Sequence, residues 1–277
     1  MAEQSATTAV GGEAASLPCR SVTDDEVAHY EQYGWVKLNA FVDLKLVHEL
    51  LQIARQRMGD DGDSNAPYGI NQPYFNAEYG GLFKVPRIKA LMEGVGQGAK
   101  RLMRRRSGVG VRYFTDFFAP KLPSAKKTKN AGNGPTSFHQ DFITFAVDRT
   151  GGMTFWLALE NYDPGWGTMS FVNGSHRLGV MGSYHTYGKG DALDVFPELR
   201  ELEMSKPVSY AAGDVTVHSH LTVHGAGANL HDRPRWAYLM LVQPADVCWN
   251  GAPPEAFDPA GMTPNQPLDD ERFPVLA

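Results

Sequence analysis

From about residue 109 onward the chain is a series of short strand-like segments separated by turn residues, and this series limits the possible folds more than any other feature. Gly, Pro, Asn and Asp stand between segments that are rich in β-branched and aromatic residues. The segments read VGVRYFTDFF, SFHQDFITFAV, MTFWLALEN, PVSYAAGDVTVHSHLTVH and RWAYLMLV. Such a series after a helical region predicts a mainly β barrel or jelly roll.

Helical patterns occupy the region before these strands. The segment TDDE at 23–26 has the pattern of a capping box, and Asp43 precedes a second stretch with helical periodicity. Residues 85–106 predict a third helix, whose basic end suits a helix C-terminus. We expect these N-terminal α-helices to support the barrel by covering its apolar surface.

This dependence of the strands on the helices predicts a single domain over residues 21–277, with a C-terminal extension from about Pro253. Residues 1–20 are rich in Ala, Ser, Thr and Gly, and we expect a disordered N-terminal tail there. Residues 59–83 are polar, glycine-rich and aromatic, which is typical of either a mobile lid or a long surface loop.

Charge and composition exclude several classes of protein. The formal net charge of −5 provides no overall positive field, so we expect no nucleic-acid partner. The chain contains no run of about eighteen apolar residues, so we expect no membrane span. Cys19 and Cys248 are far apart in the sequence, which favours a reducing compartment and a cytoplasmic location. The sequence does not indicate an oligomeric state.

His139 and Asp141 stand one residue apart inside the strand-like segment SFHQDFITFAV. Residues i and i+2 of a strand point to the same face, so both side chains are expected to point inward. Burying a carboxylate is costly without a partner. The pair is therefore either two ligands of a metal ion or a buried His–Asp hydrogen bond.

A third ligand would come from residues 213–242, which contain four histidines. His218, His220 and His224 share strand parity, so alternation does not choose among them. The position of His224 at the strand end, beside the turn GAGAN, favours it. Two histidines and one carboxylate are the ligands of non-haem Fe(II) oxygenases, whereas zinc prefers four ligands. Arg235 begins the last apolar strand and faces inward only with an anion to hold.

Together these motifs resemble the phytanoyl-CoA dioxygenase family. The resemblance is carried by HQD, by the later strand from GD to HG, and by the Arg eleven residues after the His of that HG. GTMSFVNGSHR and YEQYGWVKLNAFVD are similar to further family segments, and the match extends from about residue 24 to residue 242. The resemblance implies a double-stranded β-helix of the jelly-roll or cupin type. It also implies an enzyme, a dioxygenase that uses Fe(II), 2-oxoglutarate and O2.

The family's site residues match individual positions of this chain. His139, Asp141 and His224 match the iron ligands, and Arg235 matches the arginine that binds the far carboxylate of 2-oxoglutarate. Trp156 matches an aromatic position that lines the co-substrate in some members.

One position departs from the family's pattern. Ala226 stands where several members have a serine that helps to hold the same carboxylate. Thr168 and Arg112 are the candidates for a replacement contact.

The expected substrate is a largely apolar small molecule, lipid-like or a secondary metabolite, that is hydroxylated with release of succinate and CO2. Desaturation, epimerisation and ring closure use the same oxidant and stay open. The aromatic residues near the motifs favour an apolar pocket; they are Tyr74, Phe75, Phe138, Phe142 and Phe145.

Two other classes of protein are compatible with the same residues. One is a divalent-metal hydrolase or isomerase of cupin type that has no use for 2-oxoglutarate. The other is a non-catalytic β-barrel binding protein whose histidines are buried polar groups with hydrogen-bond partners.

Overall fold

The computed structural model describes most of the chain, including all of the expected strands. Residues 1–16 of the expected tail and residues 65–84 of the expected lid or loop lie outside the described residues. No helix in the described part is long and apolar enough to cross a membrane. The described ranges are 17–64, 85–103, 108–128, 133–182, 190–254 and 257–277.

The helices form where the sequence predicts them, and their ends follow local rules. Thr23 and Glu26 make both hydrogen bonds of the capping box, and Gly34 ends the first helix with a φ of 81°. The Asp43 carboxylate accepts two backbone N–H bonds at the start of the second helix. The N-terminal elements are α1 (Asp24–Tyr33), β1 (Trp35–Leu38), α2 (Leu44–Met58) and α3 (Pro86–Leu102).

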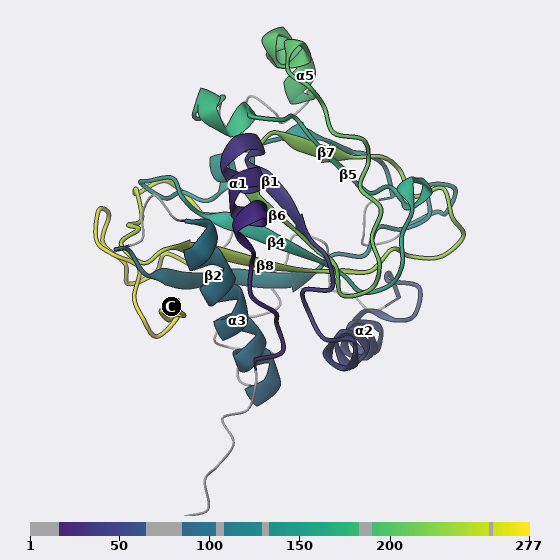
Figure 1. Ribbon diagram of the computed structural model, residues 1–277, viewed down its shortest axis with the longest axis horizontal. Coiled ribbons are helices and arrows are strands. Elements are labelled where there is room, and N and C mark those ends of the chain that lie inside the picture. Colours follow the sequence, from purple (N-terminus) through teal and green to yellow (C-terminus); the bar gives the residue numbers. More distant parts are fainter. Residues whose placement is uncertain (1–16, 65–84, 104–107, 129–132, 183–189, 255–256) are drawn as a thin grey trace, which may run out of the picture.

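The strands form two antiparallel sheets (Figure 1), which agrees with the predicted mainly β jelly roll. The larger sheet has the order β1-β6-β4-β8-β2, and the smaller has the order β3-β7-β5. The strands of the larger sheet after β1 are β2 (Val111–Phe118), β4 (Met153–Ala158), β6 (Val215–Ser219) and β8 (Ala237–Pro244). The smaller sheet contains β3 (Thr136–His139), β5 (Met169–Phe171) and β7 (His224–Ala226).

Short helical turns connect the strands. They are η4 (Asp141–Thr144), η5 (Pro164–Trp166), η6 (Ser175–Leu178), α5 (Ala192–Val195) and η7 (Pro197–Glu201).

The larger sheet is buried on both faces, and strand alternation divides its side chains between them. Phe155 of β4 packs in the main apolar core with residues of α1, α2 and α3. Its neighbours Thr154 and Trp156 point the other way and line the pocket of this protein. The helices therefore cover one face, and the other face is left to form a wall of the pocket.

Two segments differ from the sequence expectation. Asp141 is not on a strand, because β3 ends at His139 and Asp141 begins η4. The expected continuous strand up to His224 is interrupted after Ser219, and the chain crosses from the larger to the smaller sheet before β7 begins at His224. Strand parity carries no meaning across such a crossing, so the shared parity of His218 and His224 does not place their side chains on one sheet face.

Both ends of the described chain pack against the domain. Cys19 pairs with Val42, so the packed region begins slightly before the expected boundary at residue 21. At the other end Val275 pairs with Arg112, and the Leu276 N–H donates to the Val111 carbonyl at 2.7 Å. The expected C-terminal extension thus ends beside β2.

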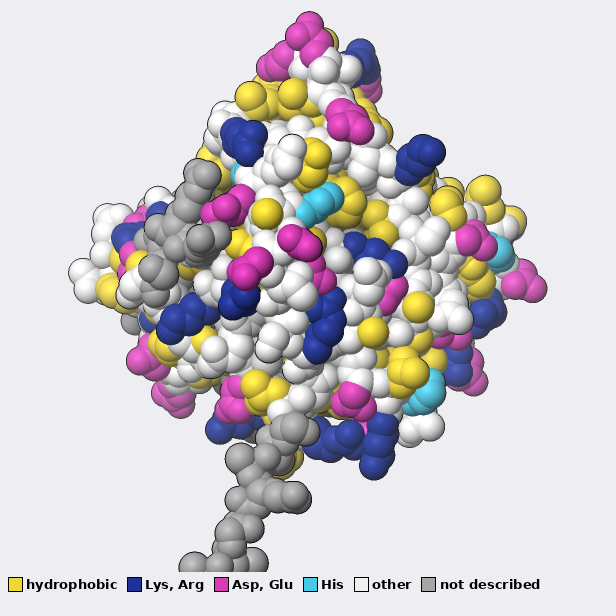
Figure 2. Space-filling view, viewed as in Figure 1, with side chains coloured by type: hydrophobic (Ala, Val, Ile, Leu, Met, Phe, Trp, Pro, Cys, Tyr) yellow, Lys and Arg dark blue, Asp and Glu magenta, His cyan; other side chains and the backbone are white. Residues whose placement is uncertain are grey.

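Charged side chains of both signs are mixed on the face shown in Figure 2. Arg101, at the basic end of α3, forms an ion pair with Asp24 at 3.0 Å. This contact agrees with the interpretation that the basic end belongs to the helix terminus; residues 104–107 lie outside the described residues.

We predict that Gly96→Ala lowers the thermal stability, which thermal unfolding followed by circular dichroism would measure. A Cβ at Gly96 of α3 would lie 2.5 Å from the Leu276 Cβ, so the C-terminal segment must move. Such overpacking costs about 1–3 kcal/mol, against at most about 1 kcal/mol gained in helix propensity. Gly108→Ala is the matched control, because no atom of the described residues beyond its chain neighbours lies within 4 Å of a Cβ there. Equal melting temperatures for the two variants would contradict the close packing.

Candidate active site

Three side chains with metal-ligating atoms meet at the edge of the smaller sheet. His139 ends β3 and His224 begins β7, and the two residues stand opposite each other in the antiparallel pair. Asp141 approaches them from the first turn of η4. One ligand atom from each of the three residues lies within 4.8 Å of the others. The residues expected from the sequence as metal ligands are therefore brought together.

Backbone carbonyls set the tautomers of both histidines. The Nδ1 atom of His139 lies 2.8 Å from the Ser137 carbonyl, and that of His224 lies 3.0 Å from the Thr222 carbonyl. Each Nδ1 therefore carries a proton and donates, so in the neutral ring the lone pair is on Nε2. These Nε2 atoms face Asp141 Oδ1 at 3.4 and 3.7 Å. Three such donors on one side of a pocket fit a non-haem Fe(II) ion.

The second carboxylate oxygen of Asp141 is held by two residues of the larger sheet. The Thr154 hydroxyl donates to Oδ2 at 2.8 Å, and His218 Nε2 lies 3.1 Å from the same atom. These contacts leave Oδ1 to face the two histidines. Neither role was predicted. The sequence does place Thr154 two residues before Trp156 on the segment MTFWLALEN, so both side chains point to the same face of the strand. His218 is thus not one of the three ligands, yet it contacts one of them.

The protonation states of Asp141 and His224 suit metal binding. Against the effect of burial, the Asp141 carboxylate raises the pKa of His139, so a metal ion would displace a proton from His139 when the pH is low. Burial alone would raise the pKa of Asp141, but His224, His139 and His218 together hold it well below its ordinary value. Burial and the neighbouring His218 hold the pKa of His224 well below its ordinary value. Asp141 is therefore ionised and His224 neutral near pH 7, as metal ligands must be.

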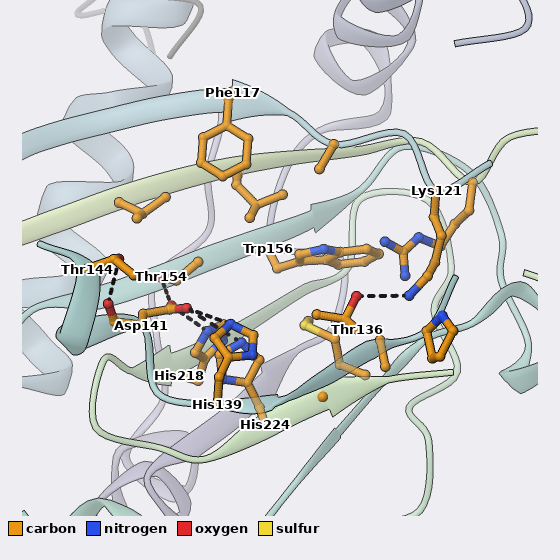
Figure 3. Close-up of a pocket in the computed structure, with 18 of the residues that line it drawn as sticks. Phe117, Lys121, Thr136, His139, Asp141, Thr144, Thr154, Trp156, His218 and His224 are labelled. Carbon is orange, nitrogen blue, oxygen red and sulfur yellow. Dashed lines mark hydrogen bonds and ion pairs between the residues drawn. The ribbon is translucent and has the colours of Figure 1, made fainter. Parts of the chain in front are cut away.

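The three residues lie at one end of a pocket with a volume of about 730 Å³ between the two sheets. Figure 3 shows Asp141 with the histidines at that end and Lys121 with Thr136 at the other, with Trp156 between them. Apolar residues form much of the remaining wall; they are Phe117, Phe145, Met169, Leu239 and Leu241. Phe145 thus lines the pocket as expected, Phe138 and Phe142 do not line it, and Tyr74 and Phe75 lie outside the described residues.

Arg235 is a buried cation in the wall of this pocket. Its guanidinium carbon lies 4.8 Å from the centre of the Trp156 ring, and Nη1 donates to the Gly167 carbonyl. Its Nε has no hydrogen-bond partner, and burial lowers the pKa of the guanidinium to about 10. Among the described residues, Arg235 forms no ion pair with a carboxylate. A buried cation of this kind is suited to an anionic ligand.

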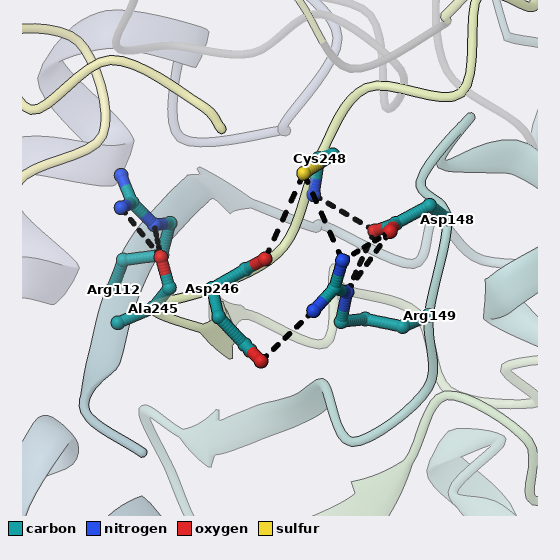
Figure 4. A network of polar contacts seen from close by, with 6 residues as sticks. All are labelled: Arg112, Asp148, Arg149, Ala245, Asp246 and Cys248. Atoms are coloured by element: carbon teal, nitrogen blue, oxygen red, sulfur yellow. Dashed lines mark hydrogen bonds and ion pairs between the residues drawn. The ribbon is translucent and has the colours of Figure 1, made fainter. Parts of the chain in front are cut away.

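Two expected contacts with the co-substrate are not supported by the geometry. Arg112 is not in the pocket, because its guanidinium donates to the Ala245 carbonyl (Figure 4) and also to the carbonyls of Leu268 and Phe273. Its role is to anchor the C-terminal segment, so its assignment to the co-substrate is corrected. Thr168 is buried beside the pocket residue Met169, and its hydroxyl has no partner, but it is not among the residues that line the pocket.

The remaining histidines of residues 213–242 lie outside the ligand set. His220 is buried, its ring contacts Phe145 edge-on, and burial lowers its pKa to about 3. His231 stacks on Trp166 at 3.9 Å between ring centres. Neither residue lines the pocket. The choice of His224 as the third ligand candidate agrees with this arrangement.

We predict that Thr154→Val weakens Fe(II) binding by about 10- to 100-fold, because a hydrogen bond that orients the ligand Asp141 is lost while the side-chain shape is kept. Anaerobic equilibrium dialysis of Fe(II) would measure the affinity. Thr115→Val is the matched control, since Thr115 is also buried in the pocket wall, whereas the hydrogen bonds to Asp141 Oδ2 come from Thr154 and His218. Unchanged affinity in Thr154→Val would show that the hydrogen bond does not orient the ligand.

Comparison with known proteins agrees with this geometry. Residues 114–237 match the family model described as phytanoyl-CoA dioxygenase (PhyH). No curated protein matches the chain significantly in sequence.

Solved structures share the fold over most of the chain. The epimerase SnoN from nogalamycin biosynthesis, in complex with Fe³⁺, alpha ketoglutarate and nogalamycin RO, is 25% identical. Its TM-score is 0.69, and the match covers 92% of this chain and 98% of SnoN. The alpha ketoglutarate dependent carbocyclase SnoK is 22% identical with a TM-score of 0.66, covering 92% and 97%. EctD from S. alaskensis, with 2-oxoglutarate and 5-hydroxyectoine, is 15% identical with a TM-score of 0.62, covering 94% and 92%.

Proposed function

We propose that this chain, whose residues 114–237 match the phytanoyl-CoA dioxygenase family model, is an Fe(II)- and 2-oxoglutarate-dependent oxygenase that acts on a small molecule. The observation that carries the proposal is one pocket that contains both the cluster of His139, Asp141 and His224 and the buried Arg235. The three candidate metal ligands alone fit several types of reaction. The unneutralised cation in the same pocket adds the need for an anionic ligand.

Different residues of the pocket would bind the iron and the 2-oxoglutarate. His139, Asp141 and His224 would hold the iron on one side and leave its other positions open to the pocket. Arg235 would bind the far carboxylate of 2-oxoglutarate, and Trp156 would provide a flat wall beside it. Bound iron and 2-oxoglutarate would supply the oxidising power for the reaction with O2, with release of succinate and CO2.

A divalent-metal hydrolase or isomerase of cupin type fits the pocket less well. Such an enzyme would use the same three ligands, but it has no use for a buried arginine. Burying a guanidinium without a counter-charge is costly, and nothing in the described part of the wall neutralises Arg235. A non-catalytic binding protein would likewise have no need for three ligand atoms with their lone pairs facing one point.

The apolar wall favours a largely apolar substrate, such as a lipid-like molecule or a secondary metabolite. We expect hydroxylation, and mass spectrometry of the product would then find the substrate plus one oxygen atom. Loss of two hydrogens would indicate desaturation or ring closure instead. An unchanged mass with altered stereochemistry would indicate epimerisation, the reaction for which SnoN is described. Asp141 speaks against halogenation, because a halide would need the corner that its carboxylate occupies.

We also propose a cytoplasmic location. Both cysteines are free, and burial raises the pKa of the Cys19 thiol to about 12. Free thiols agree with a reducing compartment.

We predict that Arg235→Gln raises the 2-oxoglutarate requirement by at least about tenfold, because breaking a charge-assisted pair typically costs about 2–5 kcal/mol. Fe(II) affinity without co-substrate should change little. Anaerobic titration, followed by the visible charge-transfer band of the chelate, would measure the change.

Arg233→Gln is the control for this prediction, because Arg233 is exposed and pairs with Glu160 at 2.7 Å. If Arg235→Gln only lowered the melting temperature and left the 2-oxoglutarate requirement unchanged, Arg235 would be a structural residue. The proposal of a 2-oxoglutarate enzyme would then lose its main support.

A further inference from the structure

Lys121 lies directly beside Arg235 in the pocket. The two residues exchange both backbone hydrogen bonds, with N···O distances of 2.9 and 3.0 Å. Residues paired in this way stand opposite each other, and their side chains project to the same face. Both side chains accordingly line the pocket. The backbone pairing therefore places a second cation, Lys121, next to Arg235.

The Lys121 ammonium group has no counter-charge. It is 5% exposed, and its Nζ donates to the Thr136 hydroxyl at 3.1 Å. Among the described residues, no carboxylate forms an ion pair with it. Burial and the charge of Arg235 lower its pKa to about 7. Of the described residues that line the pocket, only Asp141 is acidic, and its oxygens are engaged by histidines and Thr154 at the other end.

A structural role alone does not explain this arrangement. Two adjacent buried cations repel each other, and the Thr136 hydroxyl is a neutral acceptor that compensates neither charge. An apolar side chain at position 121 would fill the same space without desolvating a charge. The free-energy cost of burying two adjacent positive charges is offset if an anionic group binds between them.

We propose that Lys121, with Thr136, provides the second contact to the far carboxylate of 2-oxoglutarate that Arg235 binds. This inference rests on the function proposed above. Ala226 offers no hydroxyl for that contact, and Thr136 stands directly opposite Ala226 in the pairing of β3 with β7. The missing hydroxyl is thus supplied across the strand pair, and the ammonium group of Lys121 adds a charge.

A pair of 2-oxo acids tests the inference. 2-Oxopentanoate has the same metal-chelating end as 2-oxoglutarate but lacks the far carboxylate. We expect Lys121→Met, in the Fe(II)-loaded full-length enzyme under anaerobic conditions, to weaken 2-oxoglutarate binding at least about tenfold and to leave 2-oxopentanoate binding unchanged. Lys121→Arg should retain part of the preference for the dicarboxylate. Lys89→Met, on the exposed face of α3, is the control and should change neither affinity.

Stability provides an independent readout. Lys121→Met removes the repulsion from Arg235, so the metal-free variant should unfold at the same temperature as the wild type or higher. A residue with a merely structural role would give a lower melting temperature. If Lys121→Met were poorly folded, Thr136→Val would replace it in the same ligand comparison, and we expect a smaller loss in the same direction.

The outcomes separate this inference from the function on which it rests. If the wild type prefers 2-oxoglutarate and Lys121→Met keeps the full preference, Lys121 does not contact the far carboxylate and the proposed function stands. Equal weakening of both acids would also overturn the inference, because the effect would not involve that carboxylate. If the wild type itself bound 2-oxoglutarate no better than 2-oxopentanoate, the proposed function would fail.

Discussion

The carboxylate of Asp141 is the group on which the arrangement of this protein depends. A carboxylate placed between two sheets needs partners for both oxygens. Oδ1 faces His139 and His224 of the smaller sheet, whereas Oδ2 is held by Thr154 and His218 of the larger sheet. Asp141 thus connects the two sheets at the point where a metal ion fits. The same contacts therefore join the two sheets and position Asp141 in the candidate metal site.

The pocket has opposite electrical character at its two ends. Asp141 and the histidines form an end that attracts a metal cation, and Lys121 lies at the other end in Figure 3. Lys121 pairs with Arg235, and these two cations form an end that attracts an anion. A dicarboxylate with a chelating 2-oxo group matches both ends at once. Trp156 lies between them and contacts the guanidinium, so the apolar remainder of the wall is left for another molecule.

Much of the fold was predictable because its signals are local. Capping at Thr23 and Asp43, helical periodicity and short strands separated by turn residues each depend on neighbours along the chain. On β4, alternation also separates the side chains: Phe155 packs under the helices, whereas Thr154 and Trp156 line the pocket. The assignment of Asp141 to a strand was wrong because a 3-10 turn needs only a few residues and leaves little periodic signal.

The sequence by itself determined the chemical types of the site residues, because the H-x-D pair and the His224–Arg235 spacing are short-range patterns. Only the tertiary structure decided which additional groups meet them. Arg112 is engaged by carbonyls of the C-terminal segment, whereas Lys121 faces the pocket through its pairing with Arg235, which lies far away in sequence. Long-range pairing and sheet crossing bring such residues together, and neither leaves a periodic trace in the sequence around them.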